Sequence, residues 1–226
     1  MGYNTLKDLF QKKIIIISGH YGTGKTNVSV NLALKLKEKY DNISITDLDT
    51  VNPYFRTADN AAYLESKGIR AILPKYANSN VDIPSLPESL FSIFDSDGKA
   101  IVDVGGDDDG AAPLGSLKKR IETAGYEMYC VCNFCRPQTS TAEETAWLMG
   151  AIERMSGLKF TGLINNTNLS YETTPEIILD SISKMAELEK LTGLKTVFTS
   201  VSSALSPSLD VIPNVFYIEN VTKKLY

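Results

Sequence analysis

The segment that decides the fold runs from Lys13 to Thr26 and reads KIIIISGHYGTGKT. Its four consecutive isoleucines end at Ser18-Gly19, and a short β-branched run of this kind is typical of a fully buried strand. From Gly19 onward the segment fits G-x-x-x-x-G-K-[ST], directly after that strand and at the start of a helical pattern. The glycines let backbone N–H groups converge on phosphate oxygens at the positive end of a helix. The segment therefore predicts a nucleoside-triphosphate site.

The chemistry of a triphosphate assigns roles within this loop. Lys25 is expected to bridge the β- and γ-phosphate oxygens, and the Thr26 hydroxyl is expected to coordinate Mg²⁺. Backbone N–H groups supply the other contacts. The nucleotide-binding residues expected here are Gly22, Thr23, Gly24, Lys25, Thr26 and Asn27.

Strand-like and helix-like segments alternate along the rest of the chain. After the isoleucine strand, strands are predicted at Ile43–Asp47, Ile69–Leu73, Ala100–Val104, Tyr126–Asn133, Phe160–Asn165, Lys195–Ser200 and Asn214–Ile218. Helices are predicted at Thr26–Tyr40, at Thr141–Met155 with a Thr141/Glu144 capping box, and from Thr174-Pro175 to Gly193. This alternation predicts an α/β fold, with a mostly parallel sheet of seven to eight strands and helices on both faces. We expect one P-loop nucleotide-binding domain over residues 1–226, with residues 1–12 as an N-terminal extension.

Acidic residues follow two of these strands, at the sheet edge where open α/β folds bind ligands. Asp103 is expected to hold Mg²⁺ through a water, and the Gly106 amide to contact the γ-phosphate. In Asp47-Leu48-Asp49, alternation places both carboxylates on one side, so that Asp49 orients the attacking water or touches Mg²⁺. A simple strand-end turn is the alternative for Asp103, and a solvated strand end is the alternative for Asp47-Leu48-Asp49. For Asp107–Asp109 a solvated loop is the favoured interpretation, because three acids beside a triphosphate repel it.

Composition excludes several classes of protein. The 226 residues carry 23 basic and 27 acidic side chains, a net charge of −4, which argues against a generally basic nucleic-acid binder. The isoleucine run is too short to span a membrane. Three cysteines, an odd number, indicate a reducing compartment, so we expect a cytoplasmic protein without membrane insertion.

Those cysteines form C-x-C-x-x-C at Cys130, Cys132 and Cys135. Alternation puts Cys130 and Cys132 on one face of a strand, where core packing is the favoured interpretation. Three thiolates are one short of a closed metal site. The alternative is therefore a metal centre that a dimer completes across its axis.

The loop, the segment DLDTVNPYF at 47–55 and IVDVGG at 101–106 together resemble the ParA/MinD/CobQ group of P-loop ATPases, of the SIMIBI class. The resemblance extends from about Lys13 to Val201 and is greatest to nucleotide-binding members outside the partition and division-site proteins. It implies that Asp49 assists hydrolysis and that Asp103 associates with Mg²⁺. It also places Asn133 at the end of the next strand, and Asn165 or Asn166 where the group reads adenine.

Two positions bear on partners and on the base. Dimerising members of the group carry Lys-Gly where this chain has His20-Tyr21, so His20 either substitutes for that lysine or packs on Tyr21. A guanine-reading loop places an aspartate where this chain has Asn168, at the end of Asn165-Asn166-Thr167-Asn168. An amide there favours ATP over GTP, and a plain turn is the alternative.

These features predict a Mg²⁺- and ATP/ADP-binding ATPase that acts as a molecular switch. A protein partner would sense segments 50–56 and Gly105–Ala111, and a nucleotide-dependent homodimer is left open. One alternative is a small-molecule kinase or ligase of the CobQ or dethiobiotin-synthetase kind, with Pro74–Pro87 or Asp107–Asp109 lining a substrate pocket. The others are a metal-centre carrier and a module that holds nucleotide without hydrolysing it.

Overall fold

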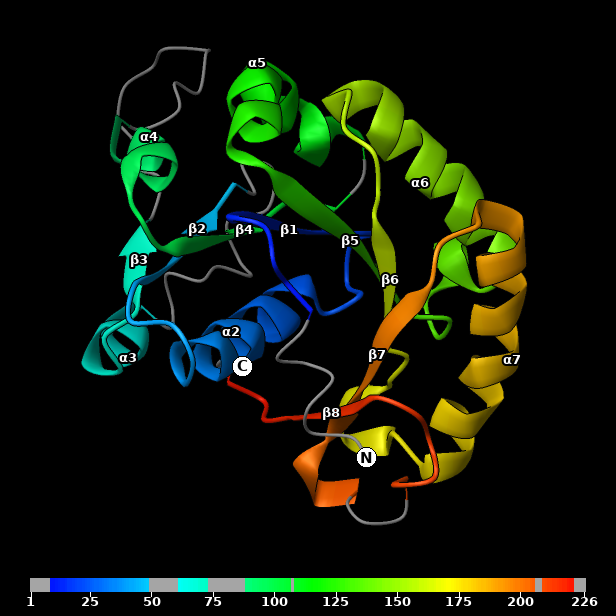
Figure 1. Cartoon of the computed structure of the whole chain (residues 1–226). Coiled ribbons are helices and arrows are strands. Elements are labelled where there is room, and N and C mark those ends of the chain that lie inside the picture. Colours follow the sequence, from blue (N-terminus) through cyan, green and yellow to red (C-terminus); the bar gives the residue numbers. More distant parts are fainter. Residues whose placement is uncertain (1–8, 49–60, 73–87, 107, 206–208, 222–226) are drawn as a thin grey trace, which may run out of the picture.

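A single eight-stranded sheet organises the computed structural model, which describes residues 9–48, 61–72, 88–106, 108–205 and 209–221 (Figure 1). The strand order is β3-β2-β4-β1-β5-β6-β7-β8, and each of these neighbouring pairs is parallel. The strands are β1 (Ile14–Ser18), β2 (Ile43–Asp47), β3 (Arg70–Ile72), β4 (Lys99–Asp103), β5 (Tyr126–Cys132), β6 (Gly162–Asn165), β7 (Thr196–Ser202) and β8 (Val215–Ile218). The predicted parallel α/β sheet is confirmed.

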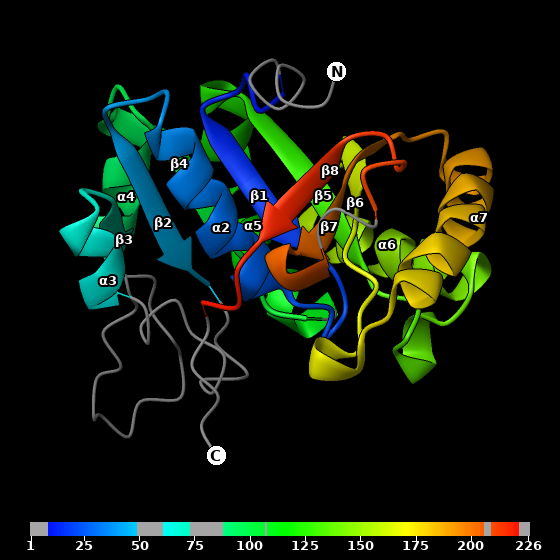
Figure 2. The same ribbon diagram turned by 90° about the horizontal axis from the view of Figure 1, so that it is seen from below.

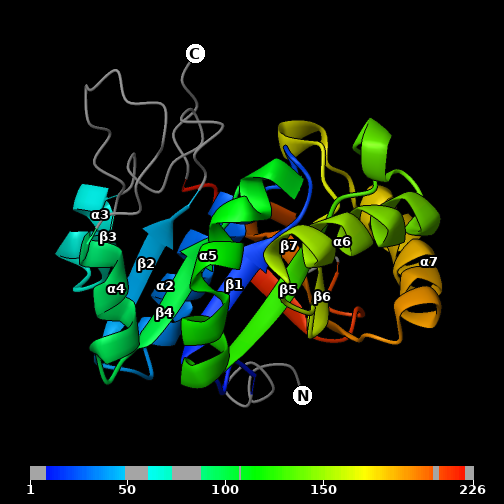
Figure 3. The ribbon, with the colours of Figure 1, turned by 90° about the horizontal axis from the view of Figure 1, so that it is seen from above.

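Helices cover both faces of this sheet. On one face lie α2 (Lys25–Lys37) and α3 (Ala61–Ser66), and Figure 2 is seen from that side. The other face carries α4 (Glu88–Asp95), α5 (Asp108–Ala124), α6 (Ala142–Ser156) and α7 (Pro175–Thr192), several of which cross the front of Figure 3. The short 3-10 turns are η2 (Pro137–Thr139), η3 (Ser170–Glu172) and η4 (Ser203–Leu205). Within the described ranges, no helix combines the length and apolarity needed to span a bilayer.

The isoleucine strand is buried on both sides. Ile14 and Ile16 belong to the core under α4, α5 and α6, whereas Ile15 and Ile17 belong to the core over α2. All four are 0% exposed. A strand covered on both faces has no polar side, which is why its sequence shows a continuous apolar run and no alternation.

The prediction of a solvated loop at Asp107–Asp109 is wrong from Asp108 onward, because α5 begins there; Asp107 lies outside the described residues. Acidic residues suit the positive N-terminal end of a helix. Leu114, Leu117 and Ile121 then recur at helical spacing and are buried against the sheet. Two short helices, α3 and α4, were not predicted from the sequence. The predicted loop Pro74–Pro87 lies outside the described residues.

The capping box predicted at the start of α6 is confirmed. Thr141 Oγ1 accepts a hydrogen bond from Glu144 N at 3.2 Å, and Glu144 Oε2 accepts one from Thr141 N at 3.2 Å. Two N–H groups that the helix itself leaves without partners are satisfied in this way.

We expect Thr141→Ala to lower the free energy of unfolding by about 1 kcal/mol, because it removes the cap acceptor. Urea denaturation of the variant and the wild type measures the difference. Ser183→Ala, on the exposed side of α7, is the control and should change stability much less. Equal midpoints for Thr141→Ala and the wild type would contradict a stabilising cap.

Candidate functional site

The phosphate loop lies between β1 and α2 and is closed by one carbonyl. His20 O accepts hydrogen bonds from Thr23 Oγ1 at 2.8 Å, from Lys25 Nζ at 3.0 Å and from Thr23 N at 3.3 Å. The Lys25 side chain is 7% exposed and starts α2, directly after Gly24. Its amine therefore lies inside the loop, bonded to a neutral acceptor that a phosphate oxygen can replace.

Asn166 holds the loop against the end of β6. Its Nδ2 donates to Thr23 O at 2.6 Å, and its Oδ1 accepts from the Ser200 hydroxyl on β7. Gly24 passes directly over this amide: its φ is 86°, and a Cβ there would lie 2.3 Å from Asn166 Nδ2. The glycine is required by both the backbone conformation and the close approach.

The other asparagines at this edge join the carboxyl ends of β5 and β6. Asn133 Nδ2 donates to Asn168 O at 3.1 Å, and Asn133 Oδ1 accepts from Cys135 N at 3.0 Å. Asn165 is 0% exposed, donates to Ser181 Oγ and accepts from Thr167 Oγ1. The side-chain amides of Asn165 and Asn166 are both bonded inside the protein. Their predicted role in reading the base stays a prediction.

Two carboxylates meet at the ends of neighbouring strands. Asp47 on β2 is the register partner of Asp103 on β4, which is in turn the partner of Ile17 on β1. The two aspartates are 1% and 2% exposed. Parallel pairing thus brings them to the edge from which the phosphate loop leaves β1.

Carboxylate and hydroxyl oxygens are the ligands that Mg²⁺ prefers, so Asp103 and Thr26 are suited to it in residue type. Asp49, the third predicted metal ligand and the predicted catalytic residue, lies outside the described residues. Within the part of the chain that is described, no group of three or more His, Cys, Asp or Glu residues could hold a metal ion. The metal assignment stays a prediction.

Gly106 connects the strand that carries Asp103 to the phosphate loop. A Cβ on Gly106 would lie 2.4 Å from Tyr21 N and 2.6 Å from Tyr21 Cα. The two backbones therefore touch, so a shift of the loop would press directly on the segment after β4.

The side chain of Asn27 faces the C-terminal segment. Its Oδ1 accepts from Val221 N at 3.0 Å, while Asn31, one turn later, bonds both Glu219 N and Glu219 O. Among the predicted nucleotide ligands, Asn27 can thus contribute its backbone N–H in the first turn of α2. Its amide is used to hold residues 219–221 against α2.

Arg136 is a residue at this site that the sequence analysis missed. It follows β5 in the loop 133–136, and its Nε donates to Gly22 O at 2.8 Å. One signal could have found it: an arginine just past a strand, at the carboxyl edge where α/β sheets bind ligands.

Cys130 and Cys132 are core residues, as the favoured interpretation expects, and Cys135 is only partly buried. Cys130 and Cys132 are each 1% exposed within the core beneath α5 and α6, with their sulfurs 4.0 Å apart. The Cys130 thiol beside it, together with burial, raises the pKa of Cys132 well above its usual value. Cys135 lies in the loop beyond, and burial raises its pKa too. Two thiols that are buried as part of the hydrophobic core do not favour a metal centre.

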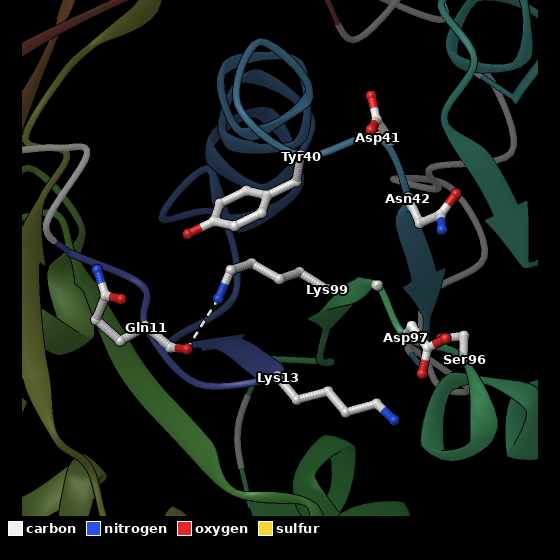
Figure 4. Close-up of a pocket in the computed structure, with 9 residues that line it drawn as sticks. Gln11, Lys13, Tyr40, Asp41, Asn42, Ser96, Asp97 and Lys99 are labelled. Atoms are coloured by element: carbon white, nitrogen blue, oxygen red, sulfur yellow. Dashed lines mark hydrogen bonds between the residues drawn. The ribbon is translucent and has the colours of Figure 1, made fainter.

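A cavity of about 580 Å³ lies at the opposite edge of the sheet, near the amino ends of β1, β2 and β4 (Figure 4). Lys99 reaches across it, donates to Gln11 O at 2.9 Å and to Lys12 O at 3.0 Å, and lies 4.7 Å from the centre of the Tyr40 ring. Burial lowers the Lys99 pKa. With Asp41 and Asp97 also lining it, this cavity does not present the positive surface that a triphosphate requires.

A parallel sheet whose central strand runs through a glycine-rich loop into a helix defines the fold of P-loop nucleoside triphosphatases. Solved structures support this fold assignment. FtsY from Mycoplasma mycoides superposes with a TM-score of 0.56 at 16% identity, over 88% of this chain and 64% of that one. FtsY from Thermotoga maritima gives 0.55 at 19% identity, over 88% and 68%.

The signal recognition particle 54 kDa protein from Aeropyrum pernix, solved in complex with GDP, gives a TM-score of 0.51 at 14% identity. That match covers 84% of this chain and 42% of the other. This chain thus spans less than two thirds of the first FtsY protein and under half of the 54 kDa protein. No protein-family model matches the sequence, and no curated protein matches it.

We expect Asn166→Ala to lower the free energy of unfolding by about 1–3 kcal/mol, because Thr23 O and Ser200 Oγ lose a buried partner. The same variant should bind nucleotide more weakly, because Thr23 is no longer held. Urea denaturation and calorimetric titration with nucleotide measure the two effects. Asn42→Ala, at an exposed position on the opposite edge, is the matched control. Unchanged stability in Asn166→Ala would show that this amide does not anchor the loop.

Proposed function

We propose that this protein is a Mg²⁺-dependent, nucleotide-hydrolysing molecular switch that prefers ATP. One observation carries the proposal: the loop from Gly19 to Thr26 leaves the central strand beside the paired carboxylates Asp47 and Asp103. A cationic loop and a helix start would hold the phosphates, and the adjacent oxygen ligands would suit their counterion. The fold shared with FtsY supports the same class of activity.

Each residue of the proposed site has a separate role in binding or hydrolysis. Lys25 exchanges His20 O for phosphate oxygens, while the N–H groups of Gly24, Lys25 and Thr26 surround the β-phosphate. Thr26 would hold Mg²⁺ directly and Asp103 would hold it through a water, and the ion would supply charge neutralisation for the phosphates. Asp49 orients the attacking water. Each role is the one that the sequence motif predicts.

The proposed switch acts through Gly106. Because its backbone touches Tyr21 in the phosphate loop, a γ-phosphate that occupies the loop displaces or anchors the segment after β4. That segment leads directly into α5, so the occupied and empty states present different surfaces to a protein partner or to a second copy of the chain. Hydrolysis removes the γ-phosphate, and the segment after β4 would then return to the position it has without that phosphate.

We expect Lys25→Ala to abolish ATP binding, because the buried amine is the principal cation of the loop. Asp49→Ala should bind ATP and fail to hydrolyse it. Calorimetric titration measures binding, and phosphate release at saturating Mg·ATP measures turnover. Lys119→Ala, which removes an exposed lysine of α5, serves as the charge control for Lys25→Ala.

Wild-type turnover in Asp49→Ala would remove that residue from the role. ADP release that requires an added metabolite, with phosphate transferred to it, would replace the switch with a small-molecule kinase. An unchanged oligomeric state between ADP and a non-hydrolysable ATP analogue would point to the same class of enzyme.

For the base, we expect ATP to displace a fluorescent nucleotide at a lower concentration than GTP. The Asn168 amide stands where a guanine-reading carboxylate would be, and it is bonded to Asn166 O and Ser170 N. GTP is the second candidate, because one of the solved structures that share the fold is a GDP complex. If GTP competes at the lower concentration, the adenine preference is wrong.

A further inference from the structure

We propose that Arg136 contacts the γ-phosphate and makes the site selective for the triphosphate over the diphosphate. The inference rests on the proposed nucleotide site and adds a residue that the loop motif does not contain. Arg136 comes from the loop after β5, on the side of β1 opposite to β4 and β2. The phosphate loop would thus have an arginine on one side and the carboxylates on the other.

A hydrogen bond to the phosphate loop places the Arg136 side chain. Its Nε donates to Gly22 O at 2.8 Å, and a Cβ on Gly22 would lie 3.6 Å from that nitrogen. The guanidinium therefore lies directly against the loop backbone. Asn133 fixes the start of this arginine's own loop, because its carbonyl accepts from Arg136 N at 3.2 Å.

The charge of Arg136 is available to a ligand. A guanidinium carries five N–H donors, and the bond to Gly22 O uses one of them. Among the described residues, the salt bridges join other pairs and none includes Arg136. A guanidinium that has no carboxylate partner among the described residues, and that lies beside the proposed phosphate loop, is suited to bind a phosphate oxygen through charge-assisted hydrogen bonds.

The part of the loop that Arg136 contacts indicates which phosphate its guanidinium reaches. Gly24 and the start of α2 form the end of the loop expected around the β-phosphate, and Lys25 reaches from there toward the γ-phosphate. Gly106, expected at the γ-phosphate, touches Tyr21 in the other half, and Arg136 is bonded to the next residue, Gly22. Gly106 and Arg136 therefore flank the same half of the loop, so we place the guanidinium at the γ-phosphate.

The test compares two ligands in three variants. Calorimetric titration with ADP and with a non-hydrolysable ATP analogue, both with Mg²⁺, gives the affinity ratio for wild type, Arg136→Ala and Arg136→Lys. We expect Arg136→Ala to lose affinity for the analogue about tenfold or more, while its affinity for ADP changes little. Arg136→Lys should recover part of the loss, because it keeps the charge without the planar fork.

Arg154→Ala is the matched control, because it removes an exposed arginine of α6 and should leave both affinities unchanged. Equal losses for ADP and the analogue in Arg136→Ala would show that the arginine only shapes the loop, and would overturn the proposal. No loss for either ligand would overturn it too. If the wild type binds neither nucleotide, the proposed function itself fails, and this result is distinct from a wild type that binds both.

Discussion

The pairing of β1 with β4 on one side and β5 on the other is the constraint on which the site depends. Ile17 stands beside Asp103, and Ser18 stands beside Cys130, so β1 and β4 end within one residue of each other and β5 continues two residues further, to Cys132. The segments that follow these three strands therefore start at the same edge of the sheet. The phosphate loop, the segment through Gly106 and the loop that carries Arg136 are neighbours for this reason, although more than a hundred residues separate the first from the last.

Burial on both faces holds that central strand in position. A slip of one residue would exchange the isoleucines between the two cores and move the loop relative to both aspartates. Each face is filled by a different set of helices, so the two cores oppose such a slip independently. The position of the loop and of the two aspartates is thus a consequence of packing in the two cores on either side of the sheet.

Polar side chains then shape the loop that packing has positioned. Asn166 reaches from β6 to Thr23 O, Ser200 from β7 supports Asn166, and Arg136 from the β5 loop reaches Gly22 O. The loop after β5 and the residue after β6 thus both bond carbonyl oxygens of the glycine-rich loop, at Gly22 and at Thr23. Both bonds go to carbonyl oxygens and so leave the N–H groups of Gly22 and Thr23 out of these contacts; N–H groups are the donors that an anion site uses.

The amino-acid sequence alone determined the fold class, all eight strands and the phosphate loop, because these depend on local patterns: a β-branched run, alternating elements and a glycine motif. It did not determine that Asp108 begins a helix, since that depends on the sheet that buries Leu114 and Leu117. The reading of the base by Asn165 or Asn166 stays a prediction, and only the structure shows that the Asn166 amide bonds the phosphate loop. Arg136 was not identified at all. Its contact joins residues 114 positions apart, and only the parallel order of β1 and β5 brings them together.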